Sequence, residues 1–358
     1  SSNQKYTTHI IEVQQNGNSG QIVWEWHIFD HMIQDVDSNK PGFGVVANHP
    51  ELMDINVPVA GFGPFSSDWF HCNGIDYNPT LDQIVFTSRF LSEFFIIDHS
   101  TTTAEAATHT GGNAGNGGDF LYRWGNPGNY KSTFGVQRIP AAVHDPRWIK
   151  DDGRPNGGYI QFFNNEGNNG NSSVDAINPP RVGLNYTFNA SSGYAPLNYD
   201  WRHNCIVSAW GQSASDRMAN GNLFVNVSGE HMYEVDTMGM VVWQYAAGPV
   251  KAFRYACDDP GIIALLGASP CGVVAVDDAD LSEINLFPNP STGVFKLSGI
   301  PSHYQSVEIT VFDVFGHQVL SLENTDVIDL AVQANGVYFV SIRIDESPII
   351  SKKISLLH

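Results

Sequence analysis

Apolar and polar residues alternate over short runs along most of this chain, and clusters of Gly, Asn, Asp and Pro separate the runs. The runs are rich in β-branched and aromatic residues, which favour strands. No segment keeps an apolar period of 3.6 residues for more than about two turns, as an amphipathic helix would. The pattern therefore predicts an all-β protein.

The predicted strands fall into groups of four that share one arrangement. Each group ends in a run where aromatic and polar residues alternate, as in residues 22–26, 120–124 and 241–245. One group comprises residues 74–78, 83–88, 93–98 and 120–124, and another comprises residues 206–210, 222–227, 231–235 and 240–245. A third begins near Val143 and includes residues 159–164 and 173–177. Repeated four-stranded units with an aromatic outer strand are typical of a β-propeller.

About three full units and the last strands of another are visible, which is few for a closed ring. Either residues 29–70 contain a further unit, or the chain lacks N-terminal blades, and we favour the second interpretation. No signal peptide is recognisable at Ser1, so we expect a mature chain or a fragment.

The composition changes after about Val276. Short strand-like runs then follow at residues 306–315, 327–330, 336–344 and 352–357, which predicts a small Ig-like β-sandwich. We therefore expect a propeller domain over residues 1–276, a linker over 277–284 and the sandwich over 285–358.

The charge balance excludes several classes of partner. The 358 residues include 37 acidic and 18 basic side chains, for a net charge of −19. A nucleic-acid binder needs a basic surface against phosphate, and docking on anionic lipid needs the same. Hydrophobic residues make up 42% of the chain, enough for a sizeable core, but no run of about 18 apolar residues could span a membrane.

The sequence predicts no metal ion and no cofactor. The four cysteines, at positions 72, 205, 257 and 271, form no CxxC pair. Cys257 and Cys271 either form a disulfide or are two buried thiols. His27 and His31 form an HxxxH pair, but it lacks the Glu of a zinc-protease motif. A phosphate-binding GxxxxGK[ST] loop is also absent.

Histidines recur at one position of the predicted units. The chain has 13 histidines, and His71, His144 and His203 each precede or open the first strand of a group. The first strand of a propeller blade lines the central channel, so we expect these three imidazoles to converge at one end of it. Arg89 follows the second strand of the first group and can reach the same place. Imidazoles beside a guanidinium form an anion pocket, although any single histidine could be an ordinary loop residue.

Residues 22–245 resemble the bacterial arylsulfotransferases, the PAPS-independent aryl-sulfate sulfotransferases with six-bladed β-propellers. The matching stretches are residues 23–26, 30–31, 68–73, 84–89, 96–102, 118–127, 144–145 and 217–222. The resemblance implies transfer of a sulfuryl group through a sulfated histidine. It implies an aryl sulfate as donor and a phenol as acceptor.

The resemblance also implies roles for individual residues. His144 matches the nucleophile, and His71 and Arg89 match the sulfate-binding pair. The family has a further sulfate-binding histidine upstream, for which only His31 and His49 could stand in. The other expected substrate-binding residues are Asn73, His99, His203, Arg217, Trp69 and Trp148.

The C-terminal region resembles the type IX secretion C-terminal sorting domain. The similarity rests on a Phe-Pro-Asn-Pro opening at residues 287–290, a central motif at 311–316, residues 334–340 and a Lys-Lys-Ile close at 352–354. It implies export across the outer membrane of a Gram-negative bacterium by the type IX machinery, after which the tail is usually removed. The alternative for this region is an Ig-like binding module.

The sequence thus favours a secreted aryl-sulfate sulfotransferase with ping-pong kinetics. One alternative is a non-catalytic secreted propeller used for surface binding, adhesion or extracellular assembly. Another is a sulfatase-like hydrolase in which water accepts the sulfuryl group. The chain could also associate with copies of itself or with a chain that completes the propeller.

Overall fold

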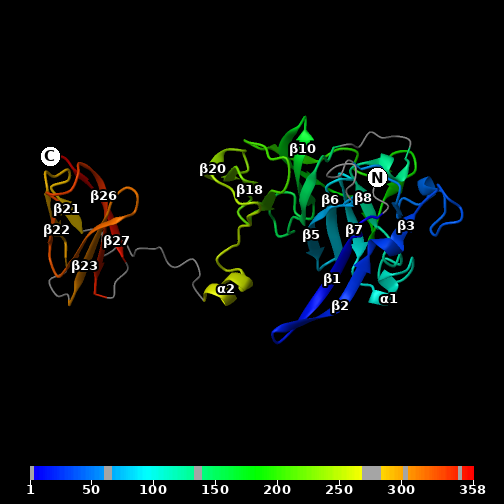
Figure 1. The fold of residues 1–358 in the computed structure, drawn as a ribbon, viewed down its shortest axis with the longest axis horizontal. Coiled ribbons are helices and arrows are strands. Elements are labelled where there is room, and N and C mark those ends of the chain that lie inside the picture. The colour runs from blue at the N-terminus through cyan, green and yellow to red at the C-terminus, as the bar shows by residue number, and fades with distance from the viewer. Residues whose placement is uncertain (1–3, 60–66, 133–138, 268–283, 301–304, 346–348) are drawn as a thin grey trace. The chain divides into compact units, whose positions relative to one another are not determined.

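The computed structural model describes residues 4–59, 67–132, 139–267, 284–300, 305–345 and 349–358. The chain divides into two compact units, Ser1–Arg254 and Tyr255–His358, and strands dominate both (Figure 1). The mostly β character expected from the sequence is confirmed. Apart from Ile284, the expected linker over 277–284 lies outside the described residues, as does Cys271.

Unit 1 contains three antiparallel sheets of four strands, each with its strands in chain order. The first is β5 (Cys72–Asn78), β6 (Gln83–Ser88), β7 (Glu93–Asp98) and β8 (Tyr122–Trp124). The second is β9 (Val143–Trp148), β10 (Ile160–Asn168), β11 (Asn171–Ile177) and β16 (Trp201–Asn204). The third is β17 (Ala214–Arg217), β18 (Leu223–Val227), β19 (His231–Val235) and β20 (Val241–Tyr245). No closed ring of sheets is present in the described residues.

The first strands of the three sheets contact one another through side-chain hydrogen bonds. The Asn73 amide on β5 donates to the carbonyl of Val143 on β9 at 3.0 Å. The backbone N–H of Ser215 on β17 donates to the Asp145 carboxylate on β9 at 3.0 Å. At Gly74 the strands come so close that a Cβ would lie 2.4 Å from Cδ of Pro146, so only glycine fits there. The beginnings of β5, β9 and β17 therefore lie together.

Hydrophobic layers fill the space between the sheets. Both β6 and β7 are buried over their whole length, because the first sheet packs on both faces. Phe86 and Phe95 belong to one cluster, with Trp26, and Phe94 belongs to another, with Phe162 of the second sheet. Because side chains alternate between the faces of a strand, each strand supplies both layers.

The remaining elements of unit 1 are short or peripheral. A hairpin of β1 (His9–Asn16) and β2 (Ser19–His27) projects from the sheets (Figure 1). In the described part of residues 29–70, the strands are the two-residue pair β3 (Met32–Ile33) and β4 (Met53–Asp54), which is no four-stranded unit. The other elements are α1 (Thr103–Ala106), η1 (Ile28–His31), η2 (Val46–Asn48), η3 (Pro127–Tyr130), β12 (Arg181–Val182), β13 (Asn185–Tyr186), β14 (Phe188–Asn189) and β15 (Gly193–Tyr194).

One strand assignment differs from the expectation. Residues 206–210 were expected to open the third sheet, but they form no strand, and β17 takes that place. The carbonyl of Ala209 accepts a hydrogen bond from the Asn165 amide, and its N–H donates to the hydroxyl of Ser172. These bonds replace a strand ladder. His203 consequently lies on β16, the outer strand of the second sheet, and not beside an inner strand.

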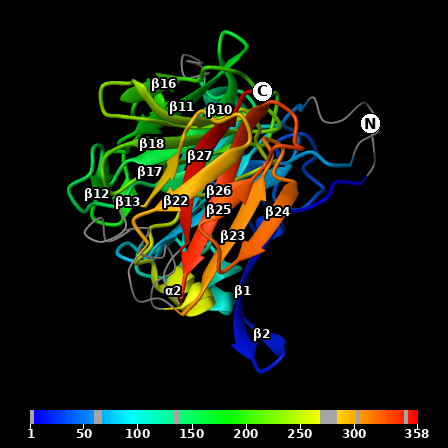
Figure 2. The same cartoon turned by 90° about the vertical axis from the view of Figure 1, so that its left-hand side faces the viewer.

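The described residues of unit 2 form a two-sheet β-domain and the helix α2 (Pro260–Leu266) (Figure 2). One sheet is β21 (Asn285–Phe287), β22 (Val294–Ser298) and β25 (Val327–Asp329). The other has the order β24 (Gln318–Glu323), β23 (Val307–Phe312), β26 (Gly336–Ile344) and β27 (Ile350–Leu356). Alternate residues of β23 and β26 are buried, and they form one core with Phe295 and Ile354.

Candidate functional site

His144 lies at the beginning of β9 and is 1% exposed. Its Nδ1 is 2.8 Å from the carbonyl oxygen of Ala142 and 2.8 Å from Oδ1 of Asn165, two acceptors, so Nδ1 carries the proton. Its Nε2 accepts a hydrogen bond of 3.1 Å from the backbone N–H of Gln212. The ring is therefore a neutral imidazole whose lone pair lies on Nε2.

The surroundings of His144 keep it uncharged. Burial is the main cause that lowers its pKa, to about 4, and the positive charges of Lys251 and Arg89 act in the same direction. The ring thus stays unprotonated at neutral pH, as a nitrogen nucleophile must.

Arg89 follows β6 and reaches the same place. Its Nη2 donates to the carbonyl of Trp210 at 3.0 Å, and its guanidinium lies over the Trp210 ring. A Cβ on Gly211 would lie 3.6 Å from Nε of Arg89 and 3.8 Å from Cε1 of His144. Arg89 and His144 therefore both border the space beside Gly211, although they come from different sheets.

His71 immediately precedes β5 and has a left-handed backbone, with φ of 51°. Its Nδ1 is 2.5 Å from the Asp68 carboxylate, which fixes the orientation of the ring. Its ring packs on Phe90, with centroids 4.7 Å apart. The backbone N–H of Arg89 donates to the carbonyl of His71, which ties the two residues together.

His71 and Asp68 line a groove of about 750 Å³. Residues 6–11 form one wall of this groove, and residues 71–75 form another. The His71 side chain is about one quarter exposed, so it is open to a small molecule in solution.

The sequence reasoning missed Lys251, which follows β20. Its Nζ donates to the carbonyl of Asn73 at 2.9 Å, so the end of the third sheet reaches the beginning of β5. Burial lowers the pKa of Lys251. Its positive charge in turn acts to lower the pKa values of His144, Cys72 and Asp145. No local motif marks this lysine, because only the fold brings it to the site.

Comparison with known families decides the ancestry of this chain. Residues 1–181 match the family model described as Arylsulfotransferase (ASST), and this match spans half of the chain. The chain belongs to the arylsulfotransferase family. His71, Arg89 and His144 all lie in the matched region of this arylsulfotransferase.

A second family model fits the C-terminal region. Residues 285–356 match the secretion system C-terminal sorting domain. The arylsulfotransferase chain is therefore a secreted protein, exported across the outer membrane by type IX secretion. The described residues include no helix of the length and hydropathy needed to cross a membrane.

Other comparisons give weak likenesses. No curated protein matches the chain. Two extracellular domains of putative hybrid two component systems from B. thetaiotaomicron are similar at 8% and 11% identity, with TM-scores of 0.29 and 0.24. The matches cover 82% and 83% of this chain, and the chain spans about half of theirs, 46% and 45%.

The side chain of Asn73 lies next to Val143, the residue before His144, and both of its polar atoms are hydrogen-bonded. Its amide nitrogen binds the Val143 carbonyl, and its Oδ1 accepts from the Thr87 hydroxyl at 2.6 Å. Asn73 therefore joins the first two sheets at Val143, the residue before His144.

Three other candidates lie at the far ends of their sheets. His99 follows β7, at the end of the first sheet opposite Arg89, and its Nδ1 binds Asp82 at 2.7 Å. Trp148 ends β9, and Arg217 ends β17, where its guanidinium stacks on Trp201. Trp148 and Arg217 each lie at the end of their strand that is farther from His144.

Trp69 and His203 also have partners away from His144. Trp69 is 2% exposed, and its indole N–H donates to the Tyr6 carbonyl at 2.9 Å. His203 Nε2 is 3.0 Å from the Tyr233 hydroxyl.

The two stand-ins for the upstream histidine differ in burial. His31 is fully buried, with Nδ1 on Asp119 at 2.7 Å and Nε2 on the Ala106 carbonyl at 2.8 Å. His49 is exposed and pairs with Glu51 at 2.8 Å. His31 thus has both nitrogens engaged inside the protein.

Cys257 is disulfide-bonded, whereas Cys72 and Cys205 are free thiols. Its expected partner, Cys271, lies outside the described residues.

Proposed function

We propose that this secreted arylsulfotransferase moves a sulfuryl group from an aryl sulfate to a phenol, with a sulfohistidine at His144. The neutral His144 imidazole, whose Nε2 lone pair faces the Gly211–Gln212 backbone beside Arg89, is the observation that carries the proposal. We further propose that the three sheets of unit 1 are blades of a β-propeller, which the contacts between their first strands support.

In the first step, Nε2 of His144 attacks the sulfur of the aryl sulfate. The N–S bond forms as the bond from sulfur to the aryl oxygen breaks, and that oxygen leaves with the electron pair. The Gln212 N–H must release Nε2 before the attack, because the same lone pair forms the new bond. Once Nε2 is sulfated, the imidazole ring is positively charged. The hydrogen bonds from Nδ1–H to the Asn165 and Ala142 oxygens stabilise this charge.

In the second step, a phenol attacks the same sulfur and the N–S bond breaks. His144 regains its lone pair, and the phenolic proton leaves to a base. We assign the proton transfers of both steps to His71, because Asp68 holds its ring in place and about one quarter of its side chain is exposed to solvent. Ping-pong kinetics follow from the covalent intermediate.

Charge stabilisation comes from the cations around the site. The oxygens of the transferred group gain negative charge in the transition state, and preorganised donors stabilise it. Arg89 supplies a planar guanidinium and Lys251 an ammonium, in a protein whose overall charge of −19 would otherwise repel the substrate.

The test is release of 4-nitrophenol from 4-nitrophenyl sulfate, with and without an added phenol. We expect release that depends on the phenol, with sulfate recovered on it, and loss of at least about 100-fold in His144→Asn. His317→Asn, at an exposed position of unit 2, is the control that should keep full activity. Release that is independent of the phenol would mean hydrolysis, and no release would leave a non-catalytic binding protein.

A further inference from the structure

A second cluster of chemically active side chains lies on the β1–β2 hairpin, and one of its members, His9, also lines the groove beside His71. The strands pair so that His9 stands opposite His27 and Ile11 opposite Glu25. Glu25 and His27 are two residues apart on β2, so their side chains leave the same face of the ribbon. The register thus places His9, Glu25 and His27 together.

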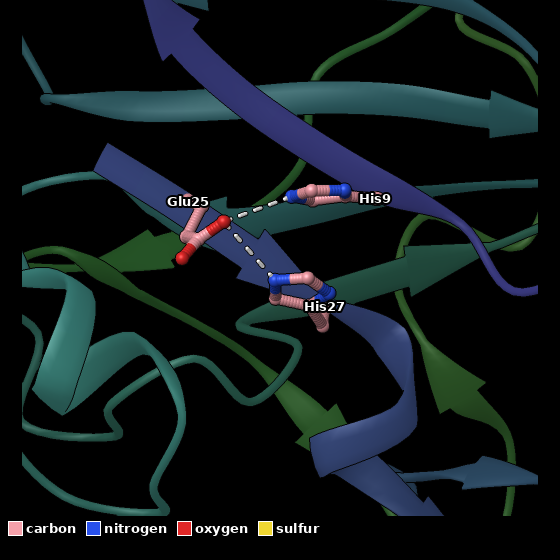
Figure 3. Close-up of side chains that lie close together, drawn as sticks. All are labelled: His9, Glu25 and His27. Atoms are coloured by element: carbon pink, nitrogen blue, oxygen red, sulfur yellow. Dashed lines mark hydrogen bonds and ion pairs between the residues drawn. The ribbon is translucent and has the colours of Figure 1, made fainter. Parts of the chain in front are cut away.

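The three side chains converge on one point (Figure 3). Nε2 of His9 is 3.2 Å from Oε2 of Glu25, and Nε2 of His27 is 3.4 Å from the same oxygen. The two imidazole rings are stacked, with centroids 3.9 Å apart and planes 22° apart. All three ligand atoms lie within 4.8 Å of one another.

This arrangement suits a zinc ion. Zinc binds imidazole nitrogen and carboxylate oxygen at about 2.0–2.2 Å, so neighbouring ligands of a tetrahedral ion lie about 3.3–3.5 Å apart. Both nitrogen-to-oxygen distances are close to that edge.

We propose that His9, Glu25 and His27 bind a divalent transition-metal ion, best fitted by Zn²⁺, with an open fourth position for water. Each side chain is between about one third and two fifths exposed, so the ion can enter from solution. The bound ion joins β1 to β2 at the end of the hairpin next to the sheets and thereby stabilises this pair of strands.

The other candidate cluster in the described residues is less accessible from solution. His31, His109 and Asp119 also lie close together. His31 is fully buried and Asp119 is 6% exposed, so an ion from solution reaches this cluster less readily than the hairpin.

The test is zinc content after the whole chain is stripped with a chelator, dialysed against ZnCl₂ and freed of loose metal. We expect wild type to retain one equivalent more than His9→Ala and His27→Ala. The control His317→Ala removes an exposed imidazole that pairs with a single carboxylate, Asp313, and should retain as much as wild type. Equal zinc in wild type and in both hairpin variants would overturn the proposal.

Cobalt(II) substitution gives an independent readout. Tetrahedral Co²⁺ with nitrogen and oxygen ligands absorbs strongly in the visible range, and we expect this band in wild type and its loss in Glu25→Gln. Because glutamine keeps the size of the side chain, the hairpin should still fold, which circular dichroism checks. A weak octahedral spectrum in wild type, or an unchanged band in Glu25→Gln, would contradict the proposed site.

Discussion

The backbone N–H of Gln212 donates a hydrogen bond of 3.1 Å to Nε2 of His144. In the same segment, the Trp210 carbonyl accepts a hydrogen bond from the Arg89 guanidinium. Gln212 and Ser213 have left-handed backbones, with φ of 58° and 79°. Residues 210–213 therefore cover the nitrogen that we propose as the nucleophile, and a substrate must displace this contact.

Gly211 gives the first prediction. Its absent side chain leaves open a space that both Arg89 and His144 border, and a Cβ there would make ordinary contacts of 3.6 and 3.8 Å. Gly211→Val extends methyl groups into that space, so we expect a rise of at least about 10-fold in KM for the aryl sulfate. Gly211→Ala should lie between Val and wild type, with melting temperatures close to wild type in both variants. Equal kinetics in all three proteins would show that substrate does not use this space.

The lowered pKa of His144 predicts a pH dependence of stability. Its pKa is about 4 in the folded chain and near 6.5 when unfolded, so between these values the unfolded chain binds more protons. The free energy of unfolding should therefore fall as the pH drops from about 6.5 to 4, by on the order of 3 kcal/mol from this group. Urea unfolding of wild type and His144→Asn measures the difference. An equally steep fall in His144→Asn would assign it to other groups.

Lys251 gives a prediction about charge. Its ammonium lowers the pKa of His144 and lies beside Asn73. Lys251→Met should raise the pKa of His144 and raise KM for an anionic donor, because one positive charge leaves the site. NMR titration of the histidine and steady-state kinetics test both effects, with the exposed Lys40→Met as control. Unchanged values in Lys251→Met would remove this lysine from the site.

A buried ion pair predicts a large effect on stability. Arg123 on β8 donates to both carboxylate oxygens of Glu93 on β7, at 3.1 and 2.7 Å, and both side chains are 0% exposed. Arg123→Met leaves the Glu93 charge buried without its partner, and we expect a loss of about 3–5 kcal/mol. Arg123→Met with Glu93→Gln should lose less. Denaturant unfolding decides, and a loss under about 1 kcal/mol in the single variant would refute the argument.

The sequence predicted the central strands of the first sheet correctly. β6 and β7 occupy the residues expected for them, because short β-branched and aromatic runs between turn residues leave little choice. Residues 206–210 also contain β-branched and aromatic residues but form no strand, because Ala209 makes tertiary hydrogen bonds with Asn165 and Ser172. Strand composition alone does not reveal such long-range partners.

Some residues of the candidate sites could likewise be predicted from the sequence, and others could not. His71, Arg89 and His144 stand in recognisable motifs, whereas Lys251 has none and reaches β5 only through the fold. The sequence spacing pairs His27 with His31, four residues away, but the structure places His27 with His9 and Glu25. The spacing of Glu25 and His27 fits one face of a strand, yet only the hairpin register brings His9 opposite.

The most direct measurement of the central claim is a single turnover with 4-nitrophenyl sulfate and no acceptor. We predict a burst of 4-nitrophenol equal to the enzyme concentration, with one sulfuryl group attached to the peptide that contains His144. Addition of a phenol should remove the label, and His317→Asn should behave as wild type. A label on another residue, or a burst that persists in His144→Asn, would contradict the account.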